Sequence, residues 1–139
     1  MSNENVKLNF LHICDYASFD QVGKLNILGI FENINSIKFP YQHPQFFVVA
    51  NISIPTSEEY ECVLRITNPE NVEISKFTLP KVKVNVNKGQ SETNIGIVGQ
   101  FNGIKFDNPG QYKIEVLVNS DLIDSKEIKV SPITNIKNV

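Results

Sequence analysis

The 139-residue sequence has no tryptophan, only one methionine and only two cysteines, Cys14 and Cys62. Its longest apolar stretch, Phe46 to Ala50, is far too short to cross a bilayer, so no membrane contact is expected. The first five residues are polar, and no basic segment followed by an apolar one marks a secretory signal. Without an export signal, two cysteines favour a reducing compartment. These absences predict a cytoplasmic protein in which both thiols are buried and reduced.

The sequence also lacks runs of like charge, sustained helical periodicity, internal repeats and low-complexity linkers. Its formal net charge is -2 and its lysines are scattered among glutamates, so the sequence does not predict a basic surface that would bind nucleic acid. The length and a hydrophobic content of 41% are those of one domain large enough to bury a core. We therefore expect a single domain over residues 6–131, with tails at residues 1–5 and 132–139.

The sequence does contain a series of short apolar–polar alternations separated by turn-forming residues, a pattern typical of strands. We expect strands at residues 6–14, 24–32, 45–54, 60–67, 72–79, 82–86, 93–101 and 112–118, and a last strand that ends at Val130. Residues 24–32 are apolar on both faces, which predicts a central strand, and Gly29 within them indicates a bulge or the close approach of a neighbour. Residues 15–23 are expected to be a polar connection, and residues 41–44, bracketed by two prolines, a loop.

A turn at Pro109-Gly110 leads into an alternating strand that begins at Tyr112. This arrangement has the form of a tyrosine corner, in which a tyrosine at the start of a late strand returns its hydroxyl group to backbone a few residues upstream. We expect Pro109, Gly110 and Tyr112 to be structural, with the Tyr112 hydroxyl bonded to backbone before Pro109. Because such a corner locks one crossing of a Greek key, the sequence predicts an all-β, immunoglobulin-like Greek-key sandwich of about seven to nine strands.

His12 and Cys14 are two residues apart in the first expected strand, so their side chains point to the same face. With Asp15 next to them, and with His43 and Cys62 brought near, they would offer the sulfur, imidazole and carboxylate groups of a zinc site. The same pair could instead act as a thiol nucleophile and its base, although nothing near Cys14 would supply an oxyanion site. The spacing matches neither CxxC nor HxxxH, and free cysteine is usually a small core residue. We therefore expect no metal, no cofactor and no catalytic residue.

Two segments rich in polar and aromatic residues, 15–18 and 41–45, are expected to be loops at an end of the sandwich, where binding sites commonly lie. The binding surface predicted from these segments and the start of the second strand consists of Asp15, Tyr16, Lys24 and His43. The alternative is a set of local structural roles, in which Asp15 caps a turn and Tyr16 packs against its neighbours.

Two blocks of the sequence resemble a known family. The first joins Cys14-Asp15-Tyr16-Ala17 to Gly23-Lys24-Leu25-Asn26-Ile27-Leu28-Gly29-Ile30-Phe31, followed by Phe39-Pro40 and His43-Pro44; the second is Pro109-Gly110-Gln111-Tyr112 with the strand after it. Together they resemble a family of small, single-domain bacterial proteins of unknown function, over nearly the whole chain. The resemblance implies a compact β domain of bacterial or phage origin, and it implies no activity, cofactor or partner. Since Ile114 stands where immunoglobulin domains often have a cysteine, no inter-sheet disulfide is expected.

These observations predict a non-enzymatic protein-binding or assembly module. We expect it to contact its partner through an exposed edge strand at residues 81–87. There, three valines centred on Val84 form an apolar row, and lysines make the opposite face polar and solvent-exposed. Antiparallel pairing of this edge in two copies would make a homodimer, and a Val84→Pro substitution would then abolish it. Two alternatives stay open: a small metal- or thiol-dependent enzyme that uses the His12/Cys14 face, and a component of a mobile-element or anti-phage system.

Overall fold

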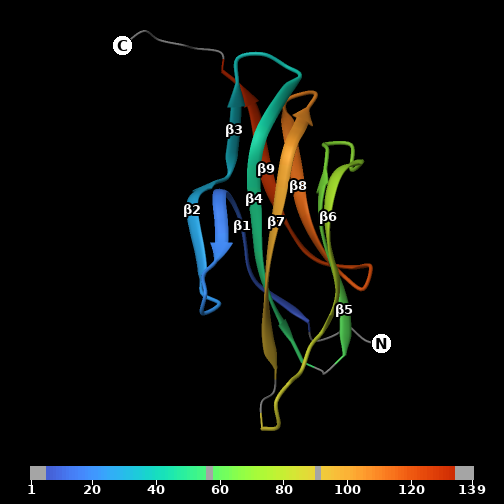
Figure 1. Cartoon of the computed structure of the whole chain (residues 1–139). Helices are drawn as coiled ribbons and strands as arrows, with labels where there is room; N and C mark the ends of the chain where they lie inside the picture. Colours follow the sequence, from blue (N-terminus) through green and yellow to red (C-terminus); the bar gives the residue numbers. More distant parts are fainter. Residues whose placement is uncertain (1–5, 56–57, 90–91, 134–139) are drawn as a thin grey trace.

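The computed structural model describes residues 6–55, 58–89 and 92–133, and these residues form nine β-strands in two sheets (Figure 1). The strands are β1 (Lys7–Phe19), β2 (Leu25–Phe31), β3 (Asn33–Ser36), β4 (Tyr41–Ile54), β5 (Glu59–Thr67), β6 (Glu73–Lys83), β7 (Thr93–Phe106), β8 (Gly110–Val118) and β9 (Asp121–Pro132). One sheet has the order β2-β1-β4-β7 and the other the order β3-β9-β8-β5-β6. The described part of the chain contains no helix that could span a membrane.

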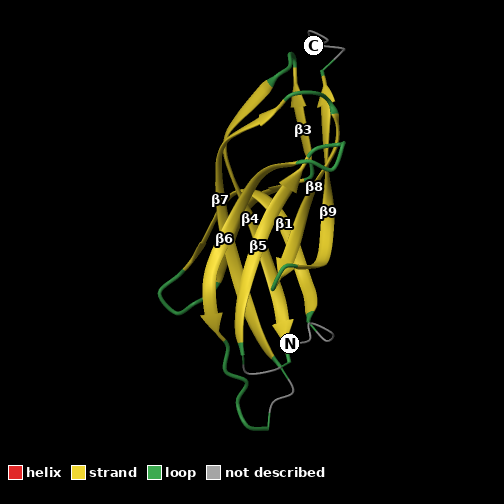
Figure 2. Ribbon diagram, turned by 90° about the vertical axis from the view of Figure 1, so that its right-hand side faces the viewer, coloured by secondary structure: helices red, strands yellow, loops and turns green. Residues whose placement is uncertain are grey.

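The two sheets face each other as a sandwich, with β6 and β7 side by side along one flank (Figure 2). Neighbouring strands are antiparallel except for β3 and β9, which run parallel. The chain changes sheet between β4 and β5, between β6 and β7 and again between β7 and β8, which gives Greek-key connections. The predicted all-β, immunoglobulin-like sandwich is confirmed.

The tyrosine corner is present at the crossing from β7 to β8. The Tyr112 hydroxyl group donates a hydrogen bond to the Asn108 carbonyl oxygen at 2.7 Å, and Tyr112 is buried. The Phe106 ring packs edge-on against the Tyr112 ring, with 5.0 Å between the centroids. Tyr112 therefore ties the start of β8 to the end of β7, as its position in the sequence predicts.

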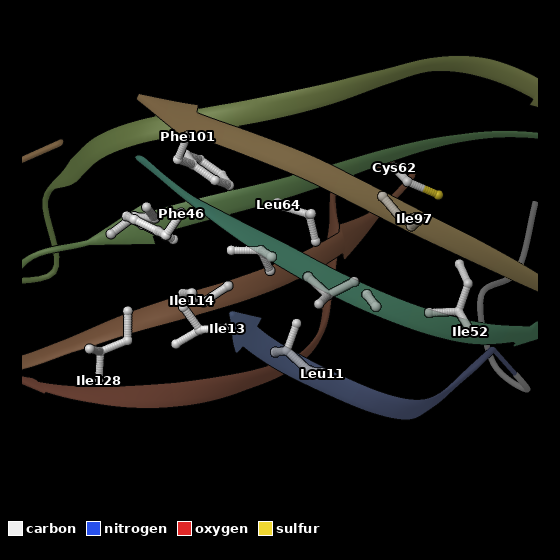
Figure 3. Packing of buried hydrophobic residues seen from close by; sticks show 14 of the residues in the cluster. Leu11, Ile13, Phe46, Ile52, Cys62, Leu64, Ile97, Phe101, Ile114 and Ile128 are labelled. Carbon is white, nitrogen blue, oxygen red and sulfur yellow. The ribbon is translucent and has the colours of Figure 1, made fainter. Parts of the chain in front are cut away.

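The main core fills the space between the sheets with alternating side chains from both (Figure 3). From β4 it takes Phe46, and the ring of Phe46 stacks on that of Phe101 from β7, with 5.5 Å between the centroids. From the facing sheet it takes Leu64 and Ile114. Because burial of one such side chain is worth about 1.5–3 kcal/mol, the alternation along these strands is enough to hold the two sheets together.

The β1–β2 hairpin folds over the outer face of the first sheet. β1 pairs with β4 as far as Cys14, and beyond Cys14 it pairs only with β2. The ring of Phe19, at the end of β1, lies against Gly96 of β7, although β1 and β7 are not neighbours in the sheet. A second cluster of buried residues lies under this hairpin: Cys14, Ala17, Phe47 and Val49. This packing explains why β4 is apolar on both faces.

Three predictions in this region are wrong. Residues 15–23 are mostly strand, because β1 continues to Phe19 and the turn occupies only residues 20–24. The strand predicted to be central, β2, is at an edge. Leu25 and Ile27 pack on the second cluster and Phe31 on the main core, whereas Leu28 and Ile30 are exposed. Residues 41–44 belong to β4 rather than to a loop. Pro44 is tolerated there because this end of β4 has a single neighbour, β7.

The prediction of an exposed edge strand at residues 81–87 is also partly wrong. β6 is an edge strand, but it ends at Lys83. Val84 lies beyond the strand, is 4% exposed, and donates its N–H to the Glu58 carbonyl oxygen at 2.9 Å. A Val84→Pro substitution would break this internal hydrogen bond, so it is no test of pairing through the edge.

Of the predicted tails, residues 1–5 and 134–139 lie outside the described residues. β9 continues past residue 131 to Pro132, and the Ile133 N–H donates to the Ser36 carbonyl oxygen at 2.9 Å. This bond extends the parallel pairing of β3 with β9 by one step.

Candidate functional site

A pocket of about 280 Å³ lies where the chain passes from the first sheet to the second. β2 ends at Phe31, β3 begins at Asn33 in the other sheet, and β1 leaves β4 beyond Cys14. The divergence of these strands leaves a hollow that is open to solvent. Its lining comes from β1, β2, β3 and β4: Asp15, Gly29, Ile30, Phe31, Asn33, Ile34, Asn35, Tyr41 and His43.

Asp15 and Gly29 lie opposite each other in the β1–β2 pair and form one wall of the pocket. Gly29 has a φ of +70°, and a Cβ atom added to it would overlap the Asp15 carboxyl group. Glycine is the residue that meets both conditions without strain. The neighbour whose close approach the sequence predicts at Gly29 is therefore the Asp15 side chain.

Tyr41 and His43 form a second wall. They are two residues apart in β4, and a hydrogen bond of 3.0 Å joins the Tyr41 hydroxyl group to His43 Nδ1. The His43 ring also packs against Phe31 and Phe46, with centroid distances of 6.0 and 5.5 Å. Burial lowers the pKa of His43 below its usual 6.5, and the charge of Asp15 offsets only part of this effect. The imidazole is therefore mainly neutral at pH 7.

The pocket carries a negative charge. Asp15 is the only ionised side chain in its lining at neutral pH, because His43 is neutral and the lining includes no lysine, arginine or glutamate. Among the described residues, the Asp15 carboxylate has no hydrogen-bond or ion-pair partner. Ile30 and Phe31 add apolar surface to the same lining. A carboxylate next to apolar and amide groups suits a ligand that combines a positive or hydrogen-bond-donating group with an apolar stem.

Two of the four predicted binding residues, Asp15 and His43, meet in this pocket, and the other two do not. Tyr16 is half exposed and packs edge-on against Phe47, with 5.2 Å between the ring centroids. Lys24 lies in the turn at the far end of the hairpin, where its N–H donates to an Asp20 carboxyl oxygen at 2.8 Å. The predicted surface is therefore divided between two ends of the hairpin.

The sequence analysis misses Tyr41, Asn33 and Asn35. The signal for Tyr41 is its spacing of two from His43, which places both side chains on one face if the segment is a strand. The flanking prolines favour a loop instead and hide this signal. No local pattern indicates that the chain changes sheet at Glu32, which is the step that brings Asn33 and Asn35 beside Asp15.

In the His12/Cys14 pair, Cys14 is buried and His12 is half-buried. Cys14 lies in the second cluster with no exposed surface, and its Sγ–H donates to the Phe47 carbonyl oxygen at 3.7 Å. Burial raises the pKa of the Cys14 thiol. The His12 ring stacks on Phe10, and its buried Nδ1 atom has no hydrogen-bond partner among the described residues. The thiol is thus held neutral and away from solvent, whereas a nucleophile needs an accessible thiolate.

Cys62 lies in the main core and is 1% exposed. Burial raises its pKa from 9.0 to about 11. Both cysteines are free and buried, as the sequence predicts, and they belong to different clusters. Among the described residues, no three histidine, cysteine, aspartate or glutamate side chains lie close enough together to hold a metal ion.

The fold and the pocket define a small immunoglobulin-like β-sandwich protein with one acidic, open hollow at its sheet crossing. Residues 9–131 match the model of a family described as "Family of unknown function (DUF6941)". The chain belongs to this family, which confirms the resemblance carried by the block from Cys14 to Phe31. No curated protein sequence matches the chain.

Several solved structures have a similar fold. The Pseudomonas fluorescens alkylpurine DNA glycosylase AlkC, bound to DNA containing an abasic site analog, matches with a TM-score of 0.58 and 13% identity, over 93% of this chain and 31% of that chain. The C-terminal domain of wzt matches with a TM-score of 0.49 and 11% identity, over 96% and 77% of the two chains. An immunoglobulin-like protein from Pseudomonas aeruginosa matches with a TM-score of 0.40 and 12% identity, over 94% and 99%. The chain spans less than a third of the glycosylase, and at these identities the likeness concerns the fold alone.

Proposed function

We propose that this protein is a non-enzymatic binding module that adds an extended strand of a partner protein to the free edge of β2. In strand addition, main-chain hydrogen bonds to the edge supply affinity and nearby side chains supply specificity. The observation that carries the proposal is the composition of β2 together with its exposure. Its seven residues include no charged residue and no proline, and Leu28 and Ile30 are 62% and 53% exposed.

The other three sheet edges are less suited to strand addition. β6 carries Pro80 and three lysines, which are common devices against pairing. β3 has only four residues, and β7 lies against β6 along the flank of the sandwich. β2 has none of these protections, and an unprotected apolar edge is typical of an interaction site.

The surroundings of β2 are apolar as well. Five of the ten exposed large apolar side chains of the described residues lie on the β1–β2 hairpin: Tyr16, Phe19, Val22, Leu28 and Ile30. A partner strand with apolar side chains at alternate positions would remove part of this surface from water, which favours association. The hairpin therefore offers both a backbone edge and an apolar surface to the same partner.

Peptides selected from a random library for binding to the full chain test the proposal. We expect the selected peptides to perturb the backbone amide signals of β2 in an NMR titration of isotope-labelled protein. A Leu28→Lys substitution places a charge on the edge and should weaken binding by about tenfold or more. Leu122→Lys is the matched control, because Leu122 is a 54% exposed leucine on β9, and it should leave the affinity unchanged.

Two results would contradict the addition of a partner protein's strand to β2. In the first, the selected peptides perturb another edge, or bind the Leu28→Lys variant as tightly as the parent. In the second, light scattering finds a dimer that Leu28→Lys converts to a monomer, since the edge would then be occupied by a second copy of the chain.

A further inference from the structure

The pocket and the free edge of β2 are continuous. Gly29, Ile30 and Phe31 belong to β2 and also line the pocket. A strand paired with this edge would therefore pass the opening of the pocket and could place one side chain in it. Which side chain fits depends on the charge and shape of the lining.

We propose that the pocket binds an arginine side chain of the docked partner strand, with the guanidinium group on the Asp15 carboxylate. This inference rests on the proposed function, and it adds the chemistry of the partner. A negative side chain would be repelled by Asp15, and a purely apolar one would cover the carboxylate without giving it a partner, which costs free energy.

The charge of the pocket favours a cation. The Asp15 carboxylate has no hydrogen-bond or ion-pair partner within the described residues, and no basic side chain lines the pocket. His43 does not neutralise it, because packing against Phe31 and Phe46 keeps the imidazole uncharged at neutral pH. Asp15 is exposed, and a guanidinium group would replace the water around its carboxylate with charge-assisted hydrogen bonds.

The shape of the pocket favours arginine over lysine. The apolar stem of an arginine can lie along Ile30, which is 53% exposed, while its planar head reaches the carboxylate, as long basic side chains commonly do. The fork of a guanidinium group matches a carboxylate with two parallel bonds, and its face stacks on aromatic rings such as that of Phe31. Asn33 and Asn35 line the same pocket, and asparagine side chains can accept the N–H groups that Asp15 leaves free.

Gly29 leaves room for the carboxylate at this place in the pocket. Because a Cβ atom at residue 29 would overlap the Asp15 carboxyl group, the space above Gly29 is the one that the carboxylate fills. Any larger residue at position 29 would therefore displace the carboxylate from the place it occupies beside β2. The position of the carboxylate beside β2 also fixes where along the partner strand the arginine must lie.

NMR titration of the full chain with N-acetyl-L-arginine methylamide tests the pocket directly. We expect saturable shifts of the Gly29, Asn33 and Asn35 amide signals. The citrulline derivative has the same shape without the charge and should bind about tenfold more weakly or worse. The Asp15→Asn variant, which keeps the side-chain shape, should bind the two derivatives equally. The same replacement of arginine by citrulline in a selected peptide should weaken binding to the parent but not to Asp15→Asn.

The outcomes separate the two proposals. If selected peptides perturb β2 but show no preference for arginine that depends on Asp15, the assignment of the pocket is wrong while strand addition stands. Equal binding of the arginine and citrulline derivatives to the parent would overturn the assignment in the same way. If no peptide perturbs β2, strand addition is wrong, and the arginine side chain has no strand to carry it.

Discussion

Tyr112 contributes to stability in two ways that a single substitution can separate. Tyr112→Phe keeps the ring contact with Phe106 and removes the hydroxyl group that donates to the Asn108 carbonyl oxygen at 2.7 Å. We expect the free energy of unfolding to fall by about 0.5–1.5 kcal/mol, the net value of one hydrogen bond. Urea denaturation followed by circular dichroism measures it. Tyr16→Phe is the control, because Tyr16 is half exposed, and an unchanged midpoint for both variants would contradict a corner that stabilises the fold.

Residues whose conformation depends on near neighbours could be predicted from the sequence. The turn before Tyr112 follows from Pro109 and Gly110, which restrict or permit backbone angles wherever they occur. The hairpin between β8 and β9 follows in the same way: Asn119 and Ser120 have φ values of 49° and 72°, the left-handed pair that two-residue hairpin turns require. Such features depend on a few consecutive residues, so the pattern alone is enough to find them.

At the scale of strands, most of the predicted strands are present, but several of their ends and the place of β2 in its sheet are wrong. Residues apolar on both faces predict a central strand, but in β2 one face packs on the second cluster and, through Phe31, on the main core, while the other face meets solvent. The error arises because this cluster lies outside the main core, under a hairpin that folds back over its own sheet. The pattern shows how much apolar surface a strand has, and it does not show which partner covers that surface.

The β1–β2 hairpin also provides a prediction about how an element positions a side chain. Gly29→Ala would place a Cβ atom against the Asp15 carboxyl group and force an alanine to a φ of +70°. We expect a loss of about 1–2 kcal/mol of stability from the left-handed backbone, and loss of arginine-derivative binding from displacement of Asp15. Denaturation and NMR titration measure the two effects.

Gly23→Ala is the matched control for that substitution. Gly23 has a φ of +82°, and a Cβ atom added there would meet no atom within 4 Å. It should therefore lose stability through backbone strain alone and keep its affinity for the arginine derivative. Binding that survives in Gly29→Ala, or that is lost equally in both variants, would show that Gly29 does not position Asp15.

At the scale of the whole molecule, half of the predicted binding set converges. Asp15 and His43 are separated by 28 positions in the sequence, and they meet because β1 pairs with β4 as far as Cys14 and Phe47. Their residue types indicate a binding role, but their contact depends on long-range topology that no local pattern contains. The same holds for Lys24, whose charge suits a binding surface and whose position at the hairpin turn takes it away from the pocket.

The pH dependence of stability should report on the core that joins the two sheets. Cys62 lies between them, and its pKa is raised from 9.0 to about 11 because burial disfavours the thiolate. Below pH 9 the thiol is protonated in both the folded and the unfolded chain, so stability is fully retained. Between pH 9 and about 11 the unfolded chain loses the proton while the folded chain keeps it. The free energy of unfolding should therefore fall over this window, by up to about 1.4 kcal/mol per pH unit.

Urea denaturation under reducing conditions at several pH values from 8 to 11 measures this slope. Cys62→Ala leaves a cavity in the core, which lowers the stability of the folded chain. It also removes the ionising thiol, so the decline of its stability above pH 9 should be shallower than that of the parent. A residual decline is expected, because burial also raises the pKa of Cys14 and of Tyr112. If the two proteins lose stability in parallel above pH 9, the Cys62 thiol ionises as readily in the folded chain as in the unfolded one, and the core around it is accessible to water.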